Sequence, residues 1–290
     1  MVVLVTGAGG QLGQSIQFIA GNYSNIQFIF CSSSDLDITN KENCKQIFAQ
    51  SKPHFCINAA AYTAVDKAES EPEKAYLINV IGAKNLSEVC LDFSTTLLHV
   101  STDFVFDGNK SIPYTEEDYP NPQSVYGQTK LDGEKAIQEI LEHYFIIRTS
   151  WVYSQFGNNF MKTMLRLGSE RDSLSVVNDQ IGTPTNAVDL AEALVKIILF
   201  SSLSFGEGRG EAFGIYNFSN DGQCSWYDFA QKIFEINHIN IDLNPIPTTS
   251  YPTPAERPKY SVLDKSKIKS TFGIEIKTWE ESLKPVIFPL

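Results

Sequence analysis

A phenol and an ammonium group are spaced one helical turn apart in the segment SVYGQTKLDGEKA, residues 124–136. Tyr126 and Lys130 would lie on one face of a helix that begins after the proline-broken stretch Tyr119–Pro122. A lysine charge and a helix N-terminus both stabilise a phenolate, so we expect a lowered pKa for Tyr126. Such a tyrosine can exchange a proton with a substrate hydroxyl or carbonyl near neutral pH. An exposed surface pair is the alternative interpretation of the same spacing.

An apolar segment that ends in hydroxyl groups supplies a partner for this pair. Residues 97–103, LLHVSTD, predict a buried strand that runs into Ser101 and Thr102. Ligands of parallel sheets bind at the carboxyl ends of the strands, where Thr102 would lie. Its hydroxyl could polarise a carbonyl group that receives a hydride. We therefore predict Thr102, Tyr126 and Lys130 as catalytic residues.

The segment TGAGGQLG, residues 6–13, follows the first apolar run and opens an amphipathic one. Gly7, Gly10 and Gly13 have the spacing of a dinucleotide-binding loop. The first glycine permits a tight turn, the second lets the backbone approach a pyrophosphate, and the third lets helix and strand pack closely. The free N–H groups of the helix N-terminus would then face the phosphates. A glycine-rich turn without a ligand is the alternative.

The residues after the second predicted strand bear on the choice of cofactor. Cys31 is followed by Ser32, Ser33 and Ser34, and no carboxylate comes before Asp35. An acidic residue at the strand end would favour NAD by binding the ribose 2′-hydroxyl. Serine hydroxyls can instead bind a 2′-phosphate, so NADP(H) is favoured and NAD(H) stays an alternative.

Apolar and amphipathic runs alternate through the first half of the chain, which predicts an α/β fold with a doubly wound parallel sheet of the Rossmann type. The apolar runs lack the alternation of half-exposed strands, so both faces of the sheet should be covered by helices. The expected strands are 2–6, 26–31, 55–58, 96–101 and 144–148, and the expected helices are 11–21, 41–51, 72–93 and 124–142.

The alternation loosens after about residue 150. We expect a dinucleotide-binding domain over 1–150, and over 151–290 mostly a smaller, partly interleaved substrate-binding lobe with some elements returning to the sheet. The glycine-rich stretch 205–210 should be a mobile loop, and 244–258, with five prolines, should be irregular. Helices are expected at 158–167, 188–200 and 226–237, and strands at 174–177 and 214–218.

The composition narrows the range of partners. The net charge of −11 argues against a nucleic-acid partner, whose phosphates require a basic face. The five cysteines are widely spaced and odd in number, which favours reduced thiols over disulfides or a zinc site. No apolar run approaches the roughly 20 residues of a membrane span, and the first residues lack a basic signal-peptide region. We therefore expect a cytoplasmic protein without a membrane partner.

Together these motifs resemble the extended short-chain dehydrogenase/reductase superfamily. Within it, the chain is similar to the dTDP-4-dehydrorhamnose reductase family from residue 1 to about 280. The resemblance implies reduction of the C4 ketone of dTDP-4-dehydro-L-rhamnose by NAD(P)H to give dTDP-L-rhamnose, a step of dTDP-rhamnose and polysaccharide biosynthesis. It is carried by the segments NAAAYTAVDKAE, STDFVFDG, YGQTK, RTSWVY and RP, which begin at Asn58, Ser101, Tyr126, Arg148 and Arg257.

The resemblance also implies roles for single residues. Tyr126 would protonate the developing alkoxide, and Lys130 would hold the nicotinamide ribose. Thr102 and Asp103 would meet the sugar, and Trp151 would pack on the substrate, unless it is a core residue at the junction of the lobes. The implied cofactor contacts are Gly10, Gln11 and Leu12 on the phosphates, Asp37 and Ile38 near the adenine, and Ala61, Tyr62 and Thr63 along the dinucleotide.

Two departures from the patterns of related proteins, and four basic residues, refine this expectation. Asp103 is followed by Phe104, whereas related dehydratases have a second acid there, so carbonyl reduction is favoured over elimination. The first helix has Gln14 and Ser15 but no carboxylate, so no metal site is predicted, and a homodimer stays an alternative. The candidates for binding the substrate diphosphate are Arg257, Lys162, Arg166 and Lys259.

Two other functions remain open. A non-catalytic, NADP-binding regulatory subunit of the same fold would keep the glycine loop but would not need Thr102, Tyr126 and Lys130. An epimerase, or a reductase of another nucleotide sugar, would keep all of these residues and differ in its product.

Overall fold

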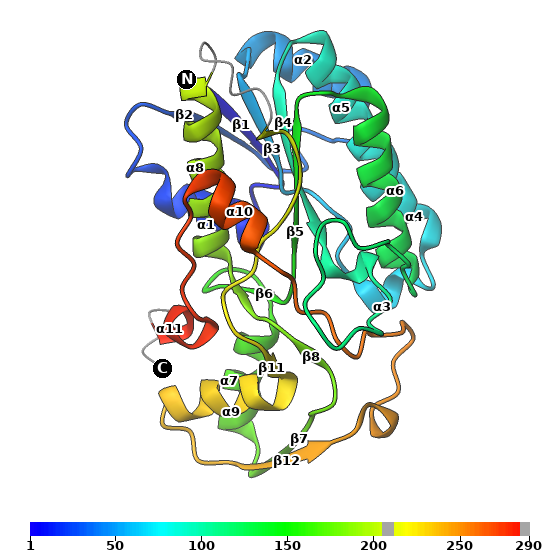
Figure 1. Ribbon diagram of the computed structural model, residues 1–290, viewed down its shortest axis with the longest axis vertical. Helices are drawn as coiled ribbons and strands as arrows, with labels where there is room; N and C mark the ends of the chain where they lie inside the picture. Colours follow the sequence, from blue (N-terminus) through cyan, green and yellow to red (C-terminus); the bar gives the residue numbers. More distant parts are fainter. Residues whose placement is uncertain (205–211, 285–290) are drawn as a thin grey trace.

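The computed structural model describes residues 1–204 and 212–284, and its centre is a six-stranded sheet in the order β10-β5-β4-β3-β1-β2. All neighbouring strands in this sheet are parallel, and helices cover both of its faces (Figure 1). The predicted doubly wound parallel sheet is therefore confirmed. The strands are β1 (Val2–Thr6), β2 (Gln27–Cys31), β3 (Phe55–Asn58), β4 (Thr96–Thr102), β5 (Tyr144–Thr149) and β10 (Gly214–Asn217).

The chain winds in opposite directions from β1, because β2 lies on one side of it and β3 on the other. The strands are apolar without alternation because both faces are buried; β3, for example, is buried at every residue. Open α/β sheets bind ligands at the carboxyl ends of the strands, beside the point where the winding reverses. In this chain that point is the edge at which β1 and β3 end.

Two helical layers enclose the sheet. On one face, α1 (Gln11–Ala20) packs against α8 (Ala187–Ser204) over a large aliphatic core. On the other face, α5 (Gly82–Asp92) packs between α2 (Lys41–Ser51) and α6 (Val125–Ile140). Figure 1 shows these layers on opposite sides of the sheet.

The helix predicted over 72–93 is interrupted in its middle. After the short helix α3 (Val65–Ala68), it consists of α4 (Pro72–Tyr76), a π-helical turn at Leu77–Ile81, and α5. Asn79 lies in that turn, and its side-chain amide bonds the backbone N–H and C=O of Tyr62 at 2.8 and 3.2 Å. These bonds hold the loop that follows β3 against the π-helical turn.

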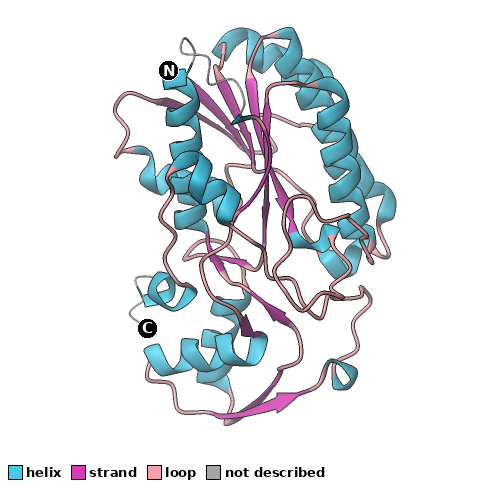
Figure 2. Cartoon of the chain, in the orientation of Figure 1, coloured by secondary structure: helices cyan, strands magenta, loops and turns pink. Residues whose placement is uncertain are grey.

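A second lobe lies below the sheet in Figure 1 and has its own apolar core, around Tyr153, Phe229 and Trp279. Figure 2 shows that its strands are short and separate from the main sheet. They pair two by two, as β6 with β9, β8 with β11, and β7 with β12. The elements of this lobe are β6 (Val152–Tyr153), α7 (Phe160–Glu170), β7 (Ser173–Val177), β8 (Ile181–Gly182), β9 (Thr185–Asn186), β11 (Cys224–Ser225), α9 (Trp226–Ile236) and β12 (Asp242–Ile246).

The prediction of an irregular segment over 244–258 is wrong at its start. Residues 244–246 belong to β12, which pairs in parallel with β7, with Pro245 opposite Val176. Proline is tolerated there because a two-stranded ladder leaves one edge of each strand without a partner, where the missing N–H is not needed. A short 3-10 turn follows at Thr248–Ser250. The glycine-rich stretch 205–210 lies outside the described residues.

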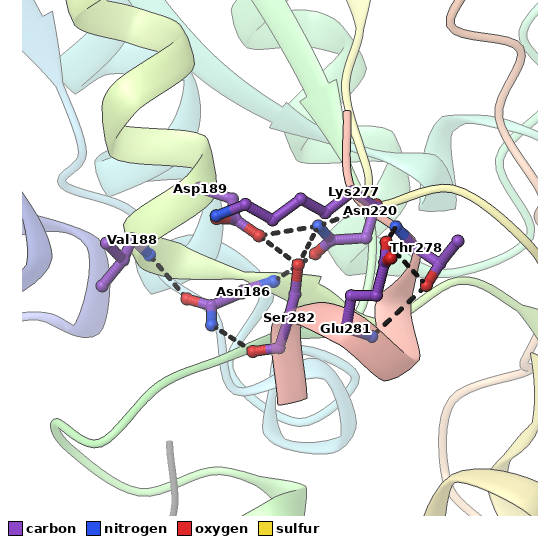
Figure 3. Close-up of polar contacts among 8 residues, drawn as sticks. All are labelled: Asn186, Val188, Asp189, Asn220, Lys277, Thr278, Glu281 and Ser282. Carbon is purple, nitrogen blue, oxygen red and sulfur yellow. Dashed lines mark hydrogen bonds and ion pairs between the residues drawn. The ribbon is translucent and has the colours of Figure 1, made fainter. Parts of the chain in front are cut away.

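The last described segment, with α10 (Ser266–Phe272) and α11 (Trp279–Leu283), is fastened by a buried polar network (Figure 3). Asn220 donates from its amide to Asp189 and to Ser282, each at 2.8 Å, and the Ser282 hydroxyl donates to Asp189. Asn186 donates to the backbone carbonyl of Ser282 at 2.8 Å. This network joins the start of α8, the chain after β10, and α11. Within the described residues, no helix combines the length and the hydropathy that crossing a bilayer requires.

Candidate active site

A cavity of about 650 Å³ opens at the carboxyl edge of the sheet, between the sheet and the second lobe. The first turn of α1 lies along it, and so do the ends of β4 and β5 and the start of α6. The predicted site residues that line it are Gly10, Gln11, Leu12, Ala61, Thr63, Thr102, Asp103, Tyr126, Lys130, Trp151 and Arg257. Those that do not are Gly7, Gly13, Asp37, Ile38 and Tyr62.

The glycine loop shapes the end of the cavity at α1. Gly7 has a φ of +65°, and a Cβ there would come within 2.7 Å of the backbone of Ala59. A Cβ on Gly13 would overlap the backbone of residues 7 and 8, so α1 can pack this closely on the loop only because residue 13 has no side chain. Gly10 is the N-cap of α1, and no side chain of the part of the protein that the structure describes caps that end. The first N–H groups of α1 are therefore available to an anion at the cavity wall.

Replacing Gly13 with alanine should destabilise the fold by about 1–3 kcal/mol, because the backbone of the loop must move to admit the methyl group. The displaced loop should also weaken binding of a dinucleotide. Urea unfolding and a dinucleotide titration measure the two effects. Gly21→Ala is the matched control, since a Cβ there meets nothing within 4 Å among the described residues. Equal stability of the two variants would contradict this account of the loop.

Tyr126 lies in the first turn of α6, whose start is fixed by the Ser124 hydroxyl, which accepts the Gly127 N–H at 3.1 Å. Its ring packs edge-on to Phe104, with centroids 5.6 Å apart. Burial raises the pKa of Tyr126 to about 12 and the charge of Asp103 adds to this rise, whereas a hydrogen bond with Thr102 opposes it. The expectation of a lowered pKa for Tyr126 is therefore wrong for this cavity, because desolvation of the phenol is the largest effect on its pKa.

Lys130 is 2% exposed and lies against β4. Its Nζ donates to the backbone carbonyl of Val100 at 2.7 Å and lies 3.1 Å from Nε2 of His99. Burial lowers the pKa of Lys130 to about 8, although the charge of Glu134 opposes this shift. The one-turn spacing places Tyr126 and Lys130 at one cavity. The contacts of the Lys130 amine, however, are with residues of β4 and not with Tyr126.

Asp103 is buried directly after β4, where the Thr102 hydroxyl donates to its Oδ1 at 3.0 Å. Burial raises the pKa of Asp103 from its usual 3.8 to about 6, although hydrogen bonds to the carboxylate oppose the shift. Near neutral pH Asp103 is therefore mostly ionised, although burial in the fold disfavours its charged form.

That raised pKa gives a stability prediction. The folded chain binds the Asp103 proton more tightly than the unfolded chain, so this protonation stabilises the fold. The stabilisation is fully present below about pH 4 and is lost as pH rises through about 6. The free energy of unfolding falls by about 3 kcal/mol across this pH range on account of Asp103. Asp103→Asn should therefore gain stability relative to the natural chain between about pH 4 and about pH 7, measured by urea unfolding. Asp172→Asn, at an exposed position, is the comparison variant. A stability difference that does not change with pH would contradict the buried acid.

Trp151 directly follows β5 and has a φ of 46°, a conformation that a bulky residue rarely adopts. Its ring stacks on Trp226 at the start of α9, with centroids 3.6 Å apart and planes 10° from parallel. Gly182 makes room for this pair, because a Cβ there would lie 2.6 Å from the Trp151 ring. Both indoles line the cavity. The sequence did not indicate Trp226, because nothing local links residue 226 to residue 151.

Arg257 reaches the cavity from the segment after β12. Its Nη2 donates to Asp66 Oδ2 at 2.8 Å, while its Nη1 is buried without a hydrogen-bond partner among the described residues. A buried guanidinium N–H is costly when unpaired, so this atom is a candidate donor to an anionic ligand. The other basic candidates differ. Arg166 pairs with Glu170 on the surface, and Lys162 donates to the Gln155 carbonyl.

The residues predicted near the adenine have other contacts. Ile38 is buried in the apolar core, and Asp37 accepts the Thr39 hydroxyl at 2.7 Å. Tyr62, predicted to lie along the dinucleotide, donates its hydroxyl to Glu71 at 2.9 Å. Their predicted contacts with a cofactor stay predictions.

Several buried polar residues behind the cavity were missed by sequence reasoning. Glu134 and Arg148 form an ion pair at 2.6 Å, with both side chains at most 2% exposed. Ser101 donates to the same carboxylate, and His99 contacts Lys130. Glu134 follows Lys130 by one helical turn, which was a usable signal, but its partner on β5 is identifiable only from the fold.

Three comparisons with known proteins each match the whole chain or nearly all of it. The family model described as "RmlD substrate binding domain" matches residues 1–290. A curated protein of Aggregatibacter actinomycetemcomitans named dTDP-4-dehydrorhamnose reductase is 43% identical, over 98% of this chain and 97% of that protein. A crystal structure of a dTDP-4-dehydrorhamnose reductase from Clostridium acetobutylicum is 44% identical with a TM-score of 0.92, covering 99% of this chain and 98% of that one. A Bacillus anthracis dTDP-4-dehydrorhamnose reductase, in complex with NADP, is 39% identical with a TM-score of 0.92 and covers 98% of both chains.

Proposed function

Because the chain belongs to the dTDP-4-dehydrorhamnose reductase family, we propose that it reduces the C4 ketone of dTDP-4-dehydro-L-rhamnose to dTDP-L-rhamnose with NADPH. The observation that carries this proposal is the single cavity that Thr102, Tyr126 and Lys130 share with the uncapped start of α1. Such a cavity can place a proton donor and an anion-binding site around a dinucleotide and a substrate bound side by side. The proposal assigns dinucleotide binding to residues 1–150 and substrate binding mostly to 151–290.

The residues present fit a dinucleotide. Gly10, Gln11 and Leu12 would hold its phosphates at the N-terminus of α1, and Ala61 and Thr63 would lie along it. NADP(H) is the proposed cofactor, as in the complex of the Bacillus anthracis relative, and NAD(H) is its alternative. Ser32 and Ser34 are exposed or half-exposed beyond β2. Their hydroxyls bond each other at 2.7 Å and Ser32 donates to Asp35 at 2.6 Å, so they would have to release these contacts to bind a 2′-phosphate.

When bound, NADPH supplies the hydride that is added to C4 of the sugar. Tyr126 holds the proton that the ketone oxygen must receive, and its raised pKa keeps that proton on the phenol at neutral pH. An alkoxide is far more basic than a phenolate, so the transfer is favourable once C4 has accepted the hydride. Thr102 adds a hydroxyl beside Tyr126, and Lys130 would hold the ribose.

The far side of the cavity would bind the substrate. Trp151 and Trp226 offer stacked aromatic surfaces of the kind on which a sugar or a base packs. The free Nη1 of Arg257 would donate to the diphosphate, while Nη2 stays fixed on Asp66. Asp103 would meet the sugar hydroxyls.

A direct assay tests the proposal. The chain mixed with NADPH and dTDP-4-dehydrorhamnose should oxidise NADPH and release dTDP-L-rhamnose, identified by NMR. NADPH binding without turnover of any 4-keto sugar nucleotide would instead indicate a regulatory subunit. Turnover of another sugar nucleotide, with tightly retained NAD, would indicate an epimerase. The cytoplasmic location and a homodimer stay predictions.

A further inference from the structure

The side chain of Gln11 joins the cofactor-binding part of the molecule to the second lobe. Gln11 is the first residue of α1, and its Oε1 accepts the Asn159 amide N–H at 2.8 Å and the Ser154 hydroxyl at 3.3 Å. Asn159 is the N-cap of α7. A Cβ on Gly157, which has a φ of +61°, would lie 3.1 Å from the Gln11 side chain. The loop 154–159 is therefore packed on the helix start that would hold the dinucleotide phosphates.

The orientation of both amides is determined by backbone groups. Oδ1 of Asn159 accepts the backbone N–H of Lys162 at 3.0 Å, and a backbone N–H can only donate, so Nδ2 of Asn159 faces Gln11. The same Nδ2 donates to the Ser154 carbonyl at 2.7 Å. The Gln11 atom that it meets must therefore be the oxygen, which leaves Nε2 of Gln11 to donate to the Val152 carbonyl at 3.5 Å. Gln11 thus contacts the second lobe through both ends of its amide, which an apolar side chain of similar length could not do.

Both contacts lead to the aromatic pair that lines the cavity. Val152 directly follows Trp151 in the chain. Phe160 is the first residue of α7, and its ring packs on that of Trp226 with centroids 4.6 Å apart. Trp226 in turn stacks on Trp151. Each end of the Gln11 amide is therefore one residue away in the chain from a group that holds, or belongs to, this aromatic pair.

We propose that Gln11 is a positioning residue that links the two ligand sites of the cavity. This rests on the proposed function, in which the first turn of α1 holds the phosphates of NADP(H) and the indoles of Trp151 and Trp226 pack on the dTDP-sugar. Phosphates bound to the backbone N–H groups of that turn fix its geometry, and with it the Gln11 side chain. The fixed amide then holds the loop and the indoles in the arrangement that receives the sugar nucleotide. Each ligand should therefore strengthen the binding of the other by the same factor.

The test is the effect of NADP⁺ on the affinity for dTDP, two ligands that together cannot turn over. In the natural chain, calorimetry should show dTDP bound at least about fivefold more tightly when NADP⁺ is saturating, the lower end of the usual range for coupled sites. In Gln11→Met this ratio of affinities should fall to about 1, because no amide joins the two lobes. The affinity for NADP⁺ alone should change less than the ratio does, because the phosphates bind backbone N–H groups.

Gln17→Met is the matched control. Gln17 lies on the same helix and donates to the Ala8 carbonyl at 2.9 Å, a bond that stays within the cofactor-binding part, so this variant should keep the natural ratio. Asn159→Ser is the second variant, since a serine can still cap α7 but has no amide to donate to Gln11. It should lose the ratio as Gln11→Met does, and the double variant should lose no more than either single one, because both remove the same connection.

Two results would overturn the link. One is a ratio near that of the natural chain in Gln11→Met, and the other is a double variant whose ratio falls well below those of the single variants. The reductase assay stays independent, since no step here needs turnover. If dTDP binds the natural chain equally well with and without NADP⁺, the link alone is wrong. If dTDP binds in neither condition, the proposed substrate is wrong together with the link.

Discussion

Tyr126→Phe is expected to lower kcat for NADPH-dependent reduction of dTDP-4-dehydrorhamnose by about 10²–10⁴-fold, the usual contribution of a positioned proton donor. The variant keeps the ring that packs on Phe104 and removes only the hydroxyl. With the phenol gone, the ketone oxygen must take its proton from water while hydride is added. Stopped-flow or steady-state measurement of NADPH oxidation gives kcat, and a binding titration should show nearly unchanged affinity for NADPH.

Tyr119→Phe is the matched control, because Tyr119 is 89% exposed and lies outside the cavity. It should have the activity of the natural chain. Turnover by Tyr126→Phe close to that of Tyr119→Phe would show that another group donates the proton, and Thr102 would then be the first residue to test.

Arg148→Met is expected to destabilise the chain by about 3–5 kcal/mol, because it leaves the carboxylate of Glu134 buried without its partner. Arg148 also stacks over the ring of Phe106, with its guanidinium carbon 5.1 Å from the ring centroid. Urea unfolding followed by fluorescence measures the loss. The double variant Arg148→Met, Glu134→Leu should recover much of it, because no unpaired charge remains buried.

Arg166→Met provides the comparison at the surface. Its partner Glu170 is about half exposed, so the loss should be about 0–1 kcal/mol. Equal losses for the buried and the exposed arginine would contradict the assignment of a buried ion pair behind the site.

The sheet could be predicted from the sequence because each of its strands is a short apolar run between turn signals. The bounds expected for β1, β3 and α2 agree with those observed. The predictions failed where tertiary contacts override local preference. The bonds between Asn79 and Tyr62 accompany a π-turn in an expected continuous helix, and pairing with β7 makes a strand of the proline-containing β12.

The site could be predicted only as far as topology determines it. Parallel strands end at one edge, so residues at or just after the ends of β1, β3, β4 and β5 had to meet there. Gly10, Ala61, Thr102 and Trp151 do line one cavity. Protonation could not be predicted, because burial rather than spacing sets the pKa of Tyr126. Trp226 lies on an element whose position relative to β5 is decided by the packing of the second lobe.

The most direct test of the central claim is to follow deuterium from NADPH labelled on both faces of nicotinamide C4. Incubation with dTDP-4-dehydrorhamnose and the natural chain should give dTDP-L-rhamnose with deuterium at C4, detected by NMR, and the same label should be nearly absent with Tyr126→Phe. Oxidation of NADPH without deuterium at C4 of the sugar, or label transfer that does not depend on Tyr126, would contradict the account.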